Sequence, residues 1–223
     1  MSLTPHKKRI FIVDDHPLVR EWLANLIHQQ SDLAVCGETE SAPAALSSIP
    51  AAQPHLVIAD INLKNSSGVE LIKDLKKLCP DVPVMVLSMH DESLYAERAF
   101  RAGARGYVNK RETAQKMIEA IRRVLGGQLY VSEKAAQILA GQSAPGRAVN
   151  KSAIELLSDR ELEVFDKLGQ GIGTRQIAED FHVSVKTIQA YCARIKDKLN
   201  LNSATELLRE AVRWHDRRDG AKM

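Results

Sequence analysis

Five polar side chains stand at the ends of short apolar stretches in the first half of the chain: Asp14, Asp15, Asp60, Ser88 and Lys110. Apolar runs of this length, followed by turn residues, are typical of buried parallel strands. Because the carboxyl ends of parallel strands meet at one edge of a sheet, we expect the five side chains to lie close together. Each of them alone could merely cap the following helix, but their combination favours a shared site.

Phosphoryl transfer is the chemistry that suits this set of residues. Three carboxylates in one place repel each other unless a cation neutralises them, and Mg²⁺ prefers one or two carboxylates together with water and phosphate oxygens. Asp60 would attack phosphorus and form an acyl phosphate. The ammonium of Lys110, the hydroxyl of Ser88 and the cation would stabilise the charged oxygens of the phosphoryl group during transfer.

The first half of the chain alternates short apolar runs with stretches of helical periodicity. We expect strands near residues 9–13, 33–36, 55–59, 84–87 and 106–108. Helices lie between them, among them 41–49, which we expect Pro50 to end, and 68–78. This alternation predicts an α/β fold with a doubly wound, five-stranded parallel sheet, because parallel strands need helical crossovers.

Composition sets limits on the class of protein. The 223 residues suffice for two modest domains, and a net charge of +3 is too small to indicate nucleic-acid binding by itself. Three widely spaced cysteines argue against a zinc site or a disulfide framework and for a reducing compartment. No apolar run approaches the roughly 20 residues of a membrane helix, and no signal peptide is evident. We therefore expect a cytoplasmic protein without a membrane partner.

The second half of the chain follows a stretch rich in Gly, Ser and Pro at 141–146. We predict a linker at 128–152 that contains one short helix, near 132–140. Four helices should follow: one opened by the capping box Ser158-Asp-Arg-Glu161, then 175–181, 185–199 and 204–214, with a frayed polar end from 216. The second and third, joined by a tight turn at 182–184, form a helix-turn-helix pattern.

The predicted helix at 185–199 concentrates positive charge that the totals for the whole chain conceal. The segment 184–199 has four basic residues and one acidic residue. Five apolar residues share one face and must pack inward: Val185, Ile188, Cys192, Ile195 and Leu199. On the opposite face, basic residues flank Ala190 and Ala193, whose small side chains let a helix approach a DNA groove closely. A solvated helix in a small bundle would show the same pattern, so charge alone leaves both readings open.

Over residues 8–127 the sequence resembles the response-regulator receiver family. The residues that carry the resemblance are Ile12-Val-Asp14-Asp15-His16, Asp60, Gly68, Ser88, Tyr107 and Lys110. The resemblance implies a flavodoxin-like fold in which Asp60 accepts a phosphoryl group from a sensor histidine kinase or a small phosphodonor. It implies Mg²⁺ as cofactor, held by Asp14, Asp15, Asp60 and the backbone carbonyl of Asn62. Ser88 and Tyr107 would be the side chains that switch on activation, and Lys110 the active-site lysine.

Two positions depart from the receiver pattern. Lys64, after Leu63, and Arg111, after Lys110, stand where the family usually has proline. The second proline often follows a cis peptide bond, and cis bonds before other residues are rare. We therefore expect the Lys110 loop to be trans or differently shaped. Neither replacement removes a reacting group.

Residues 153–215 are similar to the LuxR-type, or NarL/FixJ-type, DNA-binding domain. The matching stretches are 157–164, 176–179, 184–189 and 198–199. The resemblance implies that the helix at 185–199 reads DNA, and the residues expected to contact it are Lys186, Thr187, Gln189, Ala190, Arg194 and Lys198. Gln189 stands where Lys is common, and Tyr191 where His is common. The loss of a cation should weaken the salt dependence of binding slightly, and Gln189 is able to read adenine.

Together these resemblances imply a phosphorylation-regulated DNA-binding transcriptional regulator, not an enzyme, that binds double-stranded DNA as a homodimer. Leu207, Leu208 and Ala211 are candidate dimer contacts, unless they pack only within their own domain. Two other hypotheses remain open. An Asp-nucleophile phosphatase usually has an acid two residues after its nucleophile, where this chain has Asn62. A regulator with a degenerate receiver would bind its partners or DNA without being phosphorylated.

Overall fold

The computed structural model describes residues 7–63, 66–89, 92–132, 136 and 153–220. The chain divides into two compact units, residues 1–147 and 148–223. No helix in the described part of the chain has an apolar stretch that would span a bilayer.

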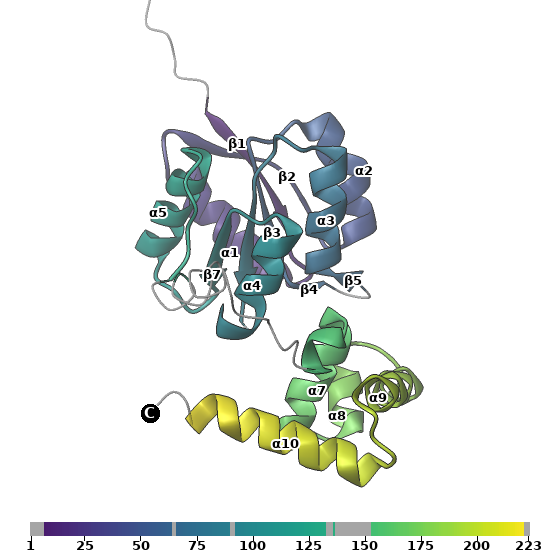
Figure 1. The fold of residues 1–223 in the computed structure, drawn as a ribbon. Helices are drawn as coiled ribbons and strands as arrows, with labels where there is room; N and C mark the ends of the chain where they lie inside the picture. Colours follow the sequence, from purple (N-terminus) through teal and green to yellow (C-terminus); the bar gives the residue numbers. More distant parts are fainter. Residues whose placement is uncertain (1–6, 64–65, 90–91, 133–135, 137–152, 221–223) are drawn as a thin grey trace, which may run out of the picture. The chain divides into compact units, whose positions relative to one another are not determined.

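The first unit is a parallel sheet with helices on both faces (Figure 1). Its strands are β1 (Lys8–Val13), β2 (Leu33–Thr39), β3 (Leu56–Asp60), β6 (Val84–Ser88) and β7 (Gly106–Asn109), in the order β2-β1-β3-β6-β7. The helices α1 (Pro17–His28) and α5 (Ala114–Leu125) cover one face, and α2 (Ala42–Ala52), α3 (Gly68–Leu78) and α4 (Glu92–Ala102) cover the other. The predicted doubly wound, five-stranded parallel sheet is confirmed.

Burial of the central strands explains why they read as continuous apolar runs. Every residue of β3 and β6 is buried, as expected of strands covered on both faces. One hydrophobic core cluster joins the sheet to α1 and α5, with Ile12 and Ile58 from the strands packed among Leu23 and Ile121 from the helices. The buried members of this cluster are all aliphatic residues or methionines.

The strand order reverses between β1 and β3, because β2 lies beyond β1 while β3 lies on its other side. In open α/β sheets the crevice at such a reversal is the usual place for a ligand. Val13 pairs with Ala59 in the sheet register, so the residues that follow them, Asp14 and Asp60, emerge side by side at this crevice.

Two short strands form an antiparallel hairpin after β3. The two-residue strands β4 (Asn62–Leu63) and β5 (Ser66–Ser67) pair antiparallel, and Gly68 donates its N–H to the Ile61 carbonyl at 2.7 Å. A Cβ at Gly68 would lie 2.1 Å from the carbonyl oxygen of Asp60, so only glycine fits there. The hairpin thus brings the start of α3 directly against the backbone of Asp60.

One predicted boundary is wrong: α2 does not end before Pro50 but continues through it to Ala52. Proline removes one N–H donor and crowds the preceding turn, but only the last turn of α2 has to adjust. Gln53 then adopts a left-handed conformation and donates its N–H to the Ile49 carbonyl at 3.0 Å, which closes the helix.

The edge strand β7 has a backbone partner, Tyr130, that lies beyond the end of α5. Tyr130, in the predicted linker, accepts a hydrogen bond from Tyr107 N–H at 2.9 Å and donates its own N–H to the Arg105 carbonyl at 3.0 Å. A parallel bridge pairs it with Gly106. The short helix predicted near 132–140 and most of the predicted linker lie outside the described residues.

The second unit is all-helical (Figure 1). A 3₁₀ turn, η1 (Ala153–Leu156), precedes α7 (Asp159–Gly169), α8 (Thr174–Asp180), α9 (Val185–Leu199) and α10 (Ala204–Gly220). The predicted capping box is present: Ser158 accepts from Glu161 N–H, and the Glu161 carboxylate accepts from Ser158 N–H. The turn between α8 and α9 contains His182 with φ of 52°, in agreement with the predicted helix-turn-helix.

The last helix is longer than predicted, because α10 continues from Trp214 to Gly220 where we expected a frayed end. Tertiary contacts hold the helix where this extension begins, at Trp214 and His215. The Trp214 ring lies 5.5 Å from that of Phe165, and His215 Nδ1 lies 3.5 Å from the Asp166 carboxylate on α7. Gly169 allows the close approach, since a Cβ there would lie 2.6 Å from the Ala211 carbonyl oxygen.

Candidate functional site

Lys110 joins two buried carboxylates at the carboxyl ends of the central strands. Its Nζ lies 2.6 Å from Asp14 Oδ2 and 2.7 Å from Asp60 Oδ2. The side chains of Asp14 and Asp60 are 2% and 3% exposed. The structure thus brings together three residues, from three different strand ends, that the sequence predicted to share a site.

Both oxygens of the Asp60 carboxylate have defined partners. Oδ1 accepts the backbone N–H of Asn62 at 3.1 Å, and Oδ2 accepts from the Lys110 ammonium. Asn62 lies in β4, in the hairpin after β3. The orientation of the Asp60 carboxylate is therefore fixed by the backbone that follows β3 on one side and by Lys110, which follows β7, on the other.

Burial raises the pKa of Asp60 to about 6; the nearby charge of Asp14 acts in the same direction, and Lys110 opposes the shift. Burial alone would lower the pKa of Lys110, but the carboxylates of Asp60 and Asp14 outweigh it and raise that pKa. Lys110 therefore stays a cation, and near neutral pH Asp60 is largely the anion that a nucleophile has to be.

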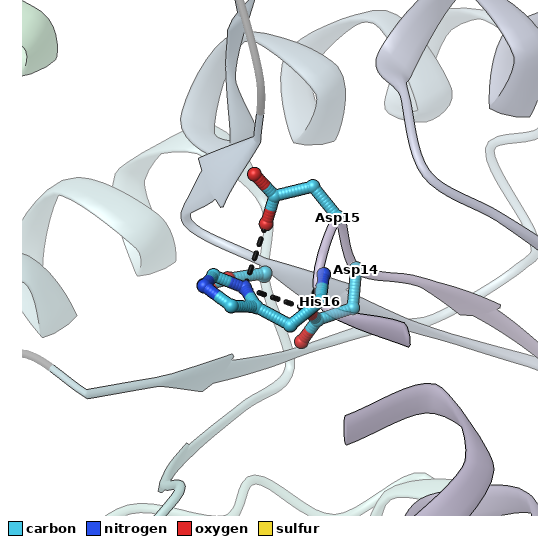
Figure 2. A group of neighbouring side chains, drawn as sticks. Asp14, Asp15 and His16 are labelled. Carbon is cyan, nitrogen blue, oxygen red and sulfur yellow. Dashed lines mark hydrogen bonds and ion pairs between the residues drawn. The ribbon is translucent and has the colours of Figure 1, made fainter. Parts of the chain in front are cut away.

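Asp15 and His16 complete the rim of the site (Figure 2). His16 Nδ1 lies 2.8 Å from Asp15 Oδ1 and 3.2 Å from Asp14 Oδ1, and the backbone N–H of His16 donates to Asp14 Oδ1 at 2.9 Å. One ligand atom from each of Asp14, Asp15, His16 and Asp60 lies within 4.8 Å of the others. Carboxylate oxygens at this spacing suit a hard divalent cation.

The sequence did not predict the role of His16 in this cluster. It appeared only as part of the motif that follows β1, and a strand-end histidine gives no signal of which carboxylate it will meet. Its side chain is 61% exposed, so it borders the site instead of lining the buried part.

Ser88 and Tyr107, the predicted switch residues, are both buried. Ser88 ends β6 and pairs in register with Asn109 of β7, and its carbonyl accepts the backbone N–H of Lys110 at 2.8 Å. Tyr107 is 1% exposed on β7. Ser88 thus lies at the end of the strand between β3 and β7, and Tyr107 lies on the strand that leads to Lys110.

The loop after Lys110 contains no cis peptide bond among the described residues, as expected for a chain with Arg111 in place of proline. The backbone N–H of Arg111 donates to Asn109 Oδ1 at 2.9 Å, which makes a tight turn after β7. The other departure, Lys64, lies outside the described residues.

The second candidate site is the exposed face of α9. Lys186, Gln189, Ala190 and Arg194 are all exposed there. Thr187, in the first turn of α9, is half-buried and lies against the N-cap residue Ser184: its N–H donates to Ser184 Oγ at 3.1 Å, and the two hydroxyl oxygens are 2.9 Å apart. Of the residues predicted to pack inward, Ile188 and Ile195 are fully buried, whereas Val185 is 37% exposed.

Lys198 differs from the other predicted DNA contacts, because its ammonium lies 2.6 Å from Glu161 Oε2 on α7.

Of the candidate dimer residues on α10, Leu207 and Ala211 are buried, and Leu208 is 46% exposed. The sequence pattern placed Leu207, Leu208 and Ala211 together as candidates. Only the packing of the folded domain shows that Leu208 is the exposed one.

Comparison with known proteins agrees with this architecture. Residues 10–122 match the response regulator receiver domain, and residues 155–211 match the luxR family of bacterial regulatory proteins. The transcriptional activator protein ExaE of Pseudomonas putida is 35% identical over 91% of this chain and 95% of its own length. The response regulator GacA of Pseudomonas viridiflava is 33% identical over 92% of this chain and 95% of its own length.

A crystal structure of a LuxR-family two-component response regulator from Aurantimonas sp. SI85-9A1 superposes with a TM-score of 0.57, at 32% identity, over 61% of this chain and 97% of that chain. The receiver and LuxR-type matches cover both units, and the relatives span nearly the whole chain. This chain therefore belongs to the two-component response regulators with a LuxR-type DNA-binding domain, and it is a DNA-binding transcriptional regulator controlled through its receiver.

Proposed function

We propose that Asp60 is the residue that accepts the phosphoryl group, and that a sensor histidine kinase or a small phosphodonor supplies it. The observation that carries this proposal is the Lys110 ammonium, 2.7 Å from Asp60 Oδ2, at the crevice where the strand order reverses. A buried carboxylate with one oxygen on a fixed cation is a suitable nucleophile, because the same cation stabilises the charge that develops on the transferred oxygens.

Mg²⁺ would be held by Asp14, Asp15, Asp60 and the backbone carbonyl of Asn62. The donor set fits, since it consists of carboxylate and carbonyl oxygens, and the three aspartates belong to the group whose ligand atoms lie within 4.8 Å of one another. When bound, the ion supplies positive charge against the phosphoryl oxygens. The chain itself contributes the Lys110 ammonium and the Ser88 hydroxyl, and Asn62 N–H keeps the carboxylate of Asp60 oriented.

Phosphorylation would draw Ser88 and Lys110 toward the new phosphoryl oxygens. Because Lys110 also holds Asp14, its displacement would alter the ends of β1, β3 and β7 together. Tyr107, buried on β7, would repack in response, and the population of receiver states would shift. The domain limits proposed for this response are 8–127 for the receiver, 128–152 for the linker and 153–215 for the DNA-binding domain.

The test uses acetyl phosphate with and without Mg²⁺, followed by a phosphate-affinity gel. Wild type should give one shifted band that needs Mg²⁺, and Asp60→Asn should give none. Asp74→Asn, at an exposed carboxylate on α3, is the matched control and should label like wild type. Rapid multiple turnover of acetyl phosphate would favour a phosphatase, and no labelling at all would favour a degenerate receiver.

The DNA-binding role belongs to the exposed face of α9. Lys186 and Arg194 supply charge, Gln189 supplies an amide, and Ala190 allows the backbone to come close to a groove. Thr187, at the N-terminal turn, would contact a phosphate through its exposed part. As a regulator of genes, the protein would act in the cytoplasm, where bacterial DNA lies.

A homodimer on paired half-sites is the proposed binding unit, with Leu208 as a contact on α10, because it is the exposed one of the three candidates. Sedimentation of the phosphorylated protein should show a dimer, and Leu208→Glu should shift it toward monomer. Selection from random duplexes should then recover two copies of one short motif. Recovery of a single copy would contradict the dimer.

A further inference from the structure

Tyr191 and Arg194 stand one turn apart on α9 and are in contact. The guanidinium carbon of Arg194 lies 5.6 Å from the centroid of the Tyr191 ring. A cation over an aromatic face is attracted by the ring quadrupole, and a guanidinium is also flat enough to stack there. Tyr191 is half-buried, so its ring has less freedom than a fully exposed side chain, whereas Arg194 is exposed. The tyrosine thus restricts where the guanidinium can go.

Two of the other three cations of α9, Lys196 and Lys198, have different surroundings. Lys198 is held by Glu161, and Lys196 is half-buried. Within the described residues neither Arg194 nor Lys186 has an ion-pair partner. Arg194 is the one arginine on this helix. It therefore combines a free positive charge with a planar donor fork held at a defined place.

Ala190 and Ala193, next to Arg194, are both exposed. Because their side chains are short, DNA can approach the helix backbone closely on this side. A base-pair edge can then come within reach of the Arg194 side chain. An arginine beside such a surface can reach the floor of the major groove. An arginine surrounded by large residues would be kept at the level of the phosphates.

We propose that Tyr191 positions Arg194 to read a guanine, so that the DNA site of this protein contains a G·C pair at the place that Arg194 reaches. Arginine binds guanine through two parallel hydrogen bonds, to O6 and N7. A guanidinium already oriented by the ring makes both bonds with less loss of side-chain freedom. This inference rests on the proposed role of α9 in DNA binding and goes beyond it, because it names the base and a residue that acts through Arg194.

The experiment begins with selection of duplexes by phosphorylated full-length protein, then measures affinity for duplexes in which each G·C pair is replaced in turn. Arg194→Lys should lower discrimination at one G·C pair by about tenfold and leave the other positions unchanged. Tyr191→Leu should lower discrimination at the same pair by about threefold. Tyr191→Phe keeps the ring and should behave like wild type. The slope of affinity against salt should stay the same for Arg194→Lys, since the charge is kept.

Several results would overturn the proposal. If wild type selects no sequence, the proposed DNA-binding function fails, and this inference fails with it. If wild type selects a site but Arg194→Lys keeps full discrimination at every pair, or weakens all duplexes equally, only the inference fails. Loss of discrimination in Tyr191→Phe as well as in Tyr191→Leu would show that the hydroxyl, not the ring, is responsible. Thermal unfolding of each variant checks that α9 remains folded.

Discussion

The ammonium of Lys198 lies 2.6 Å from Glu161 Oε2, which joins the end of α9 to the start of α7. Glu161 is 3% exposed and also accepts the backbone N–H of Ser158 at 2.7 Å, as part of the capping box. A single carboxylate therefore fixes both the first turn of α7 and the last turn of α9. This contact favours a structural role for Lys198 over a contact with DNA.

Lys198→Met should lower the free energy of unfolding of the second unit by about 1–2 kcal/mol, because it leaves a buried carboxylate without its cation. Urea denaturation in a Trp22→Phe background measures this, since Trp214 then reports the unit alone. Lys186→Met, at an exposed lysine, is the control: it should keep stability and reduce the salt slope of DNA binding by about 0.9. The reverse pattern in the two variants would place Lys198 on DNA.

The Lys198–Glu161 pair also predicts that the stability of the second unit depends on pH. Burial acts to raise the pKa of Glu161, but hydrogen bonds from Lys198 and Ser158 outweigh burial and hold that pKa below its ordinary value of 4.5. A carboxyl with a lowered folded-state pKa stabilises the fold fully above the unfolded pKa, and this contribution is lost as pH falls through the folded value. Glu161→Gln should thus be less stable than wild type at pH 7, and the difference should narrow below about pH 4.5. A constant difference at all pH values would contradict this.

Ionisation of Asp60 should affect the stability of the fold in the opposite direction to ionisation of Glu161. Burial raises its pKa to about 6, above the ordinary value of 3.8, so the ionised carboxylate destabilises the folded receiver above that pH. In the presence of a chelator at pH 7, Asp60→Asn should raise the free energy of unfolding of the first unit by about 1–3 kcal/mol. The gain should shrink as pH falls from 6 to 4. Urea denaturation followed by Trp22 in a Trp214→Phe background provides the measurement, and a loss of stability at pH 7 would refute the prediction.

Gly68→Ala tests the hairpin that orients Asp60. The new Cβ would meet the Asp60 carbonyl oxygen at 2.1 Å and Ile61 Cα at 2.6 Å, and backbone atoms cannot move aside as side chains do. We expect a loss of about 2–3 kcal/mol in stability and a loss of labelling by acetyl phosphate. Gly173→Ala, where the new Cβ would meet no atom within 4 Å, should lose much less, about 0.5–1 kcal/mol for a poorer N-cap of α8, and should label normally. Normal labelling of Gly68→Ala would show that the hairpin does not position the carboxylate.

Much of the fold followed from local patterns. α3 and α9 have the predicted bounds, 68–78 and 185–199, because the apolar periodicity is strong and both ends carry recognisable capping or breaking residues. The meeting of Asp14, Asp60 and Lys110 also followed from the sequence. Parallel strands joined by helices place all their carboxyl ends at one edge, so the topology alone brings strand-end residues together.

Other features required the folded chain. Pro50 lies inside α2, and α10 extends past Trp214, because capping by Gln53 and contacts with α7 outweigh the local signals that we used to end those helices. The partner of Lys198 lies 37 residues away in sequence, and no helical pattern specifies such a contact.

The sequence by itself determined which residues have the chemistry for phosphoryl transfer and for DNA contact, and which strands and helices carry them. Only the tertiary structure decided the distances, such as His16 against Asp15 or Arg194 over Tyr191, and the choice of buried or exposed for Leu207, Leu208 and Ala211. The reason is physical. Element type depends on neighbours along the chain, whereas side-chain partners depend on packing between elements that are distant in sequence.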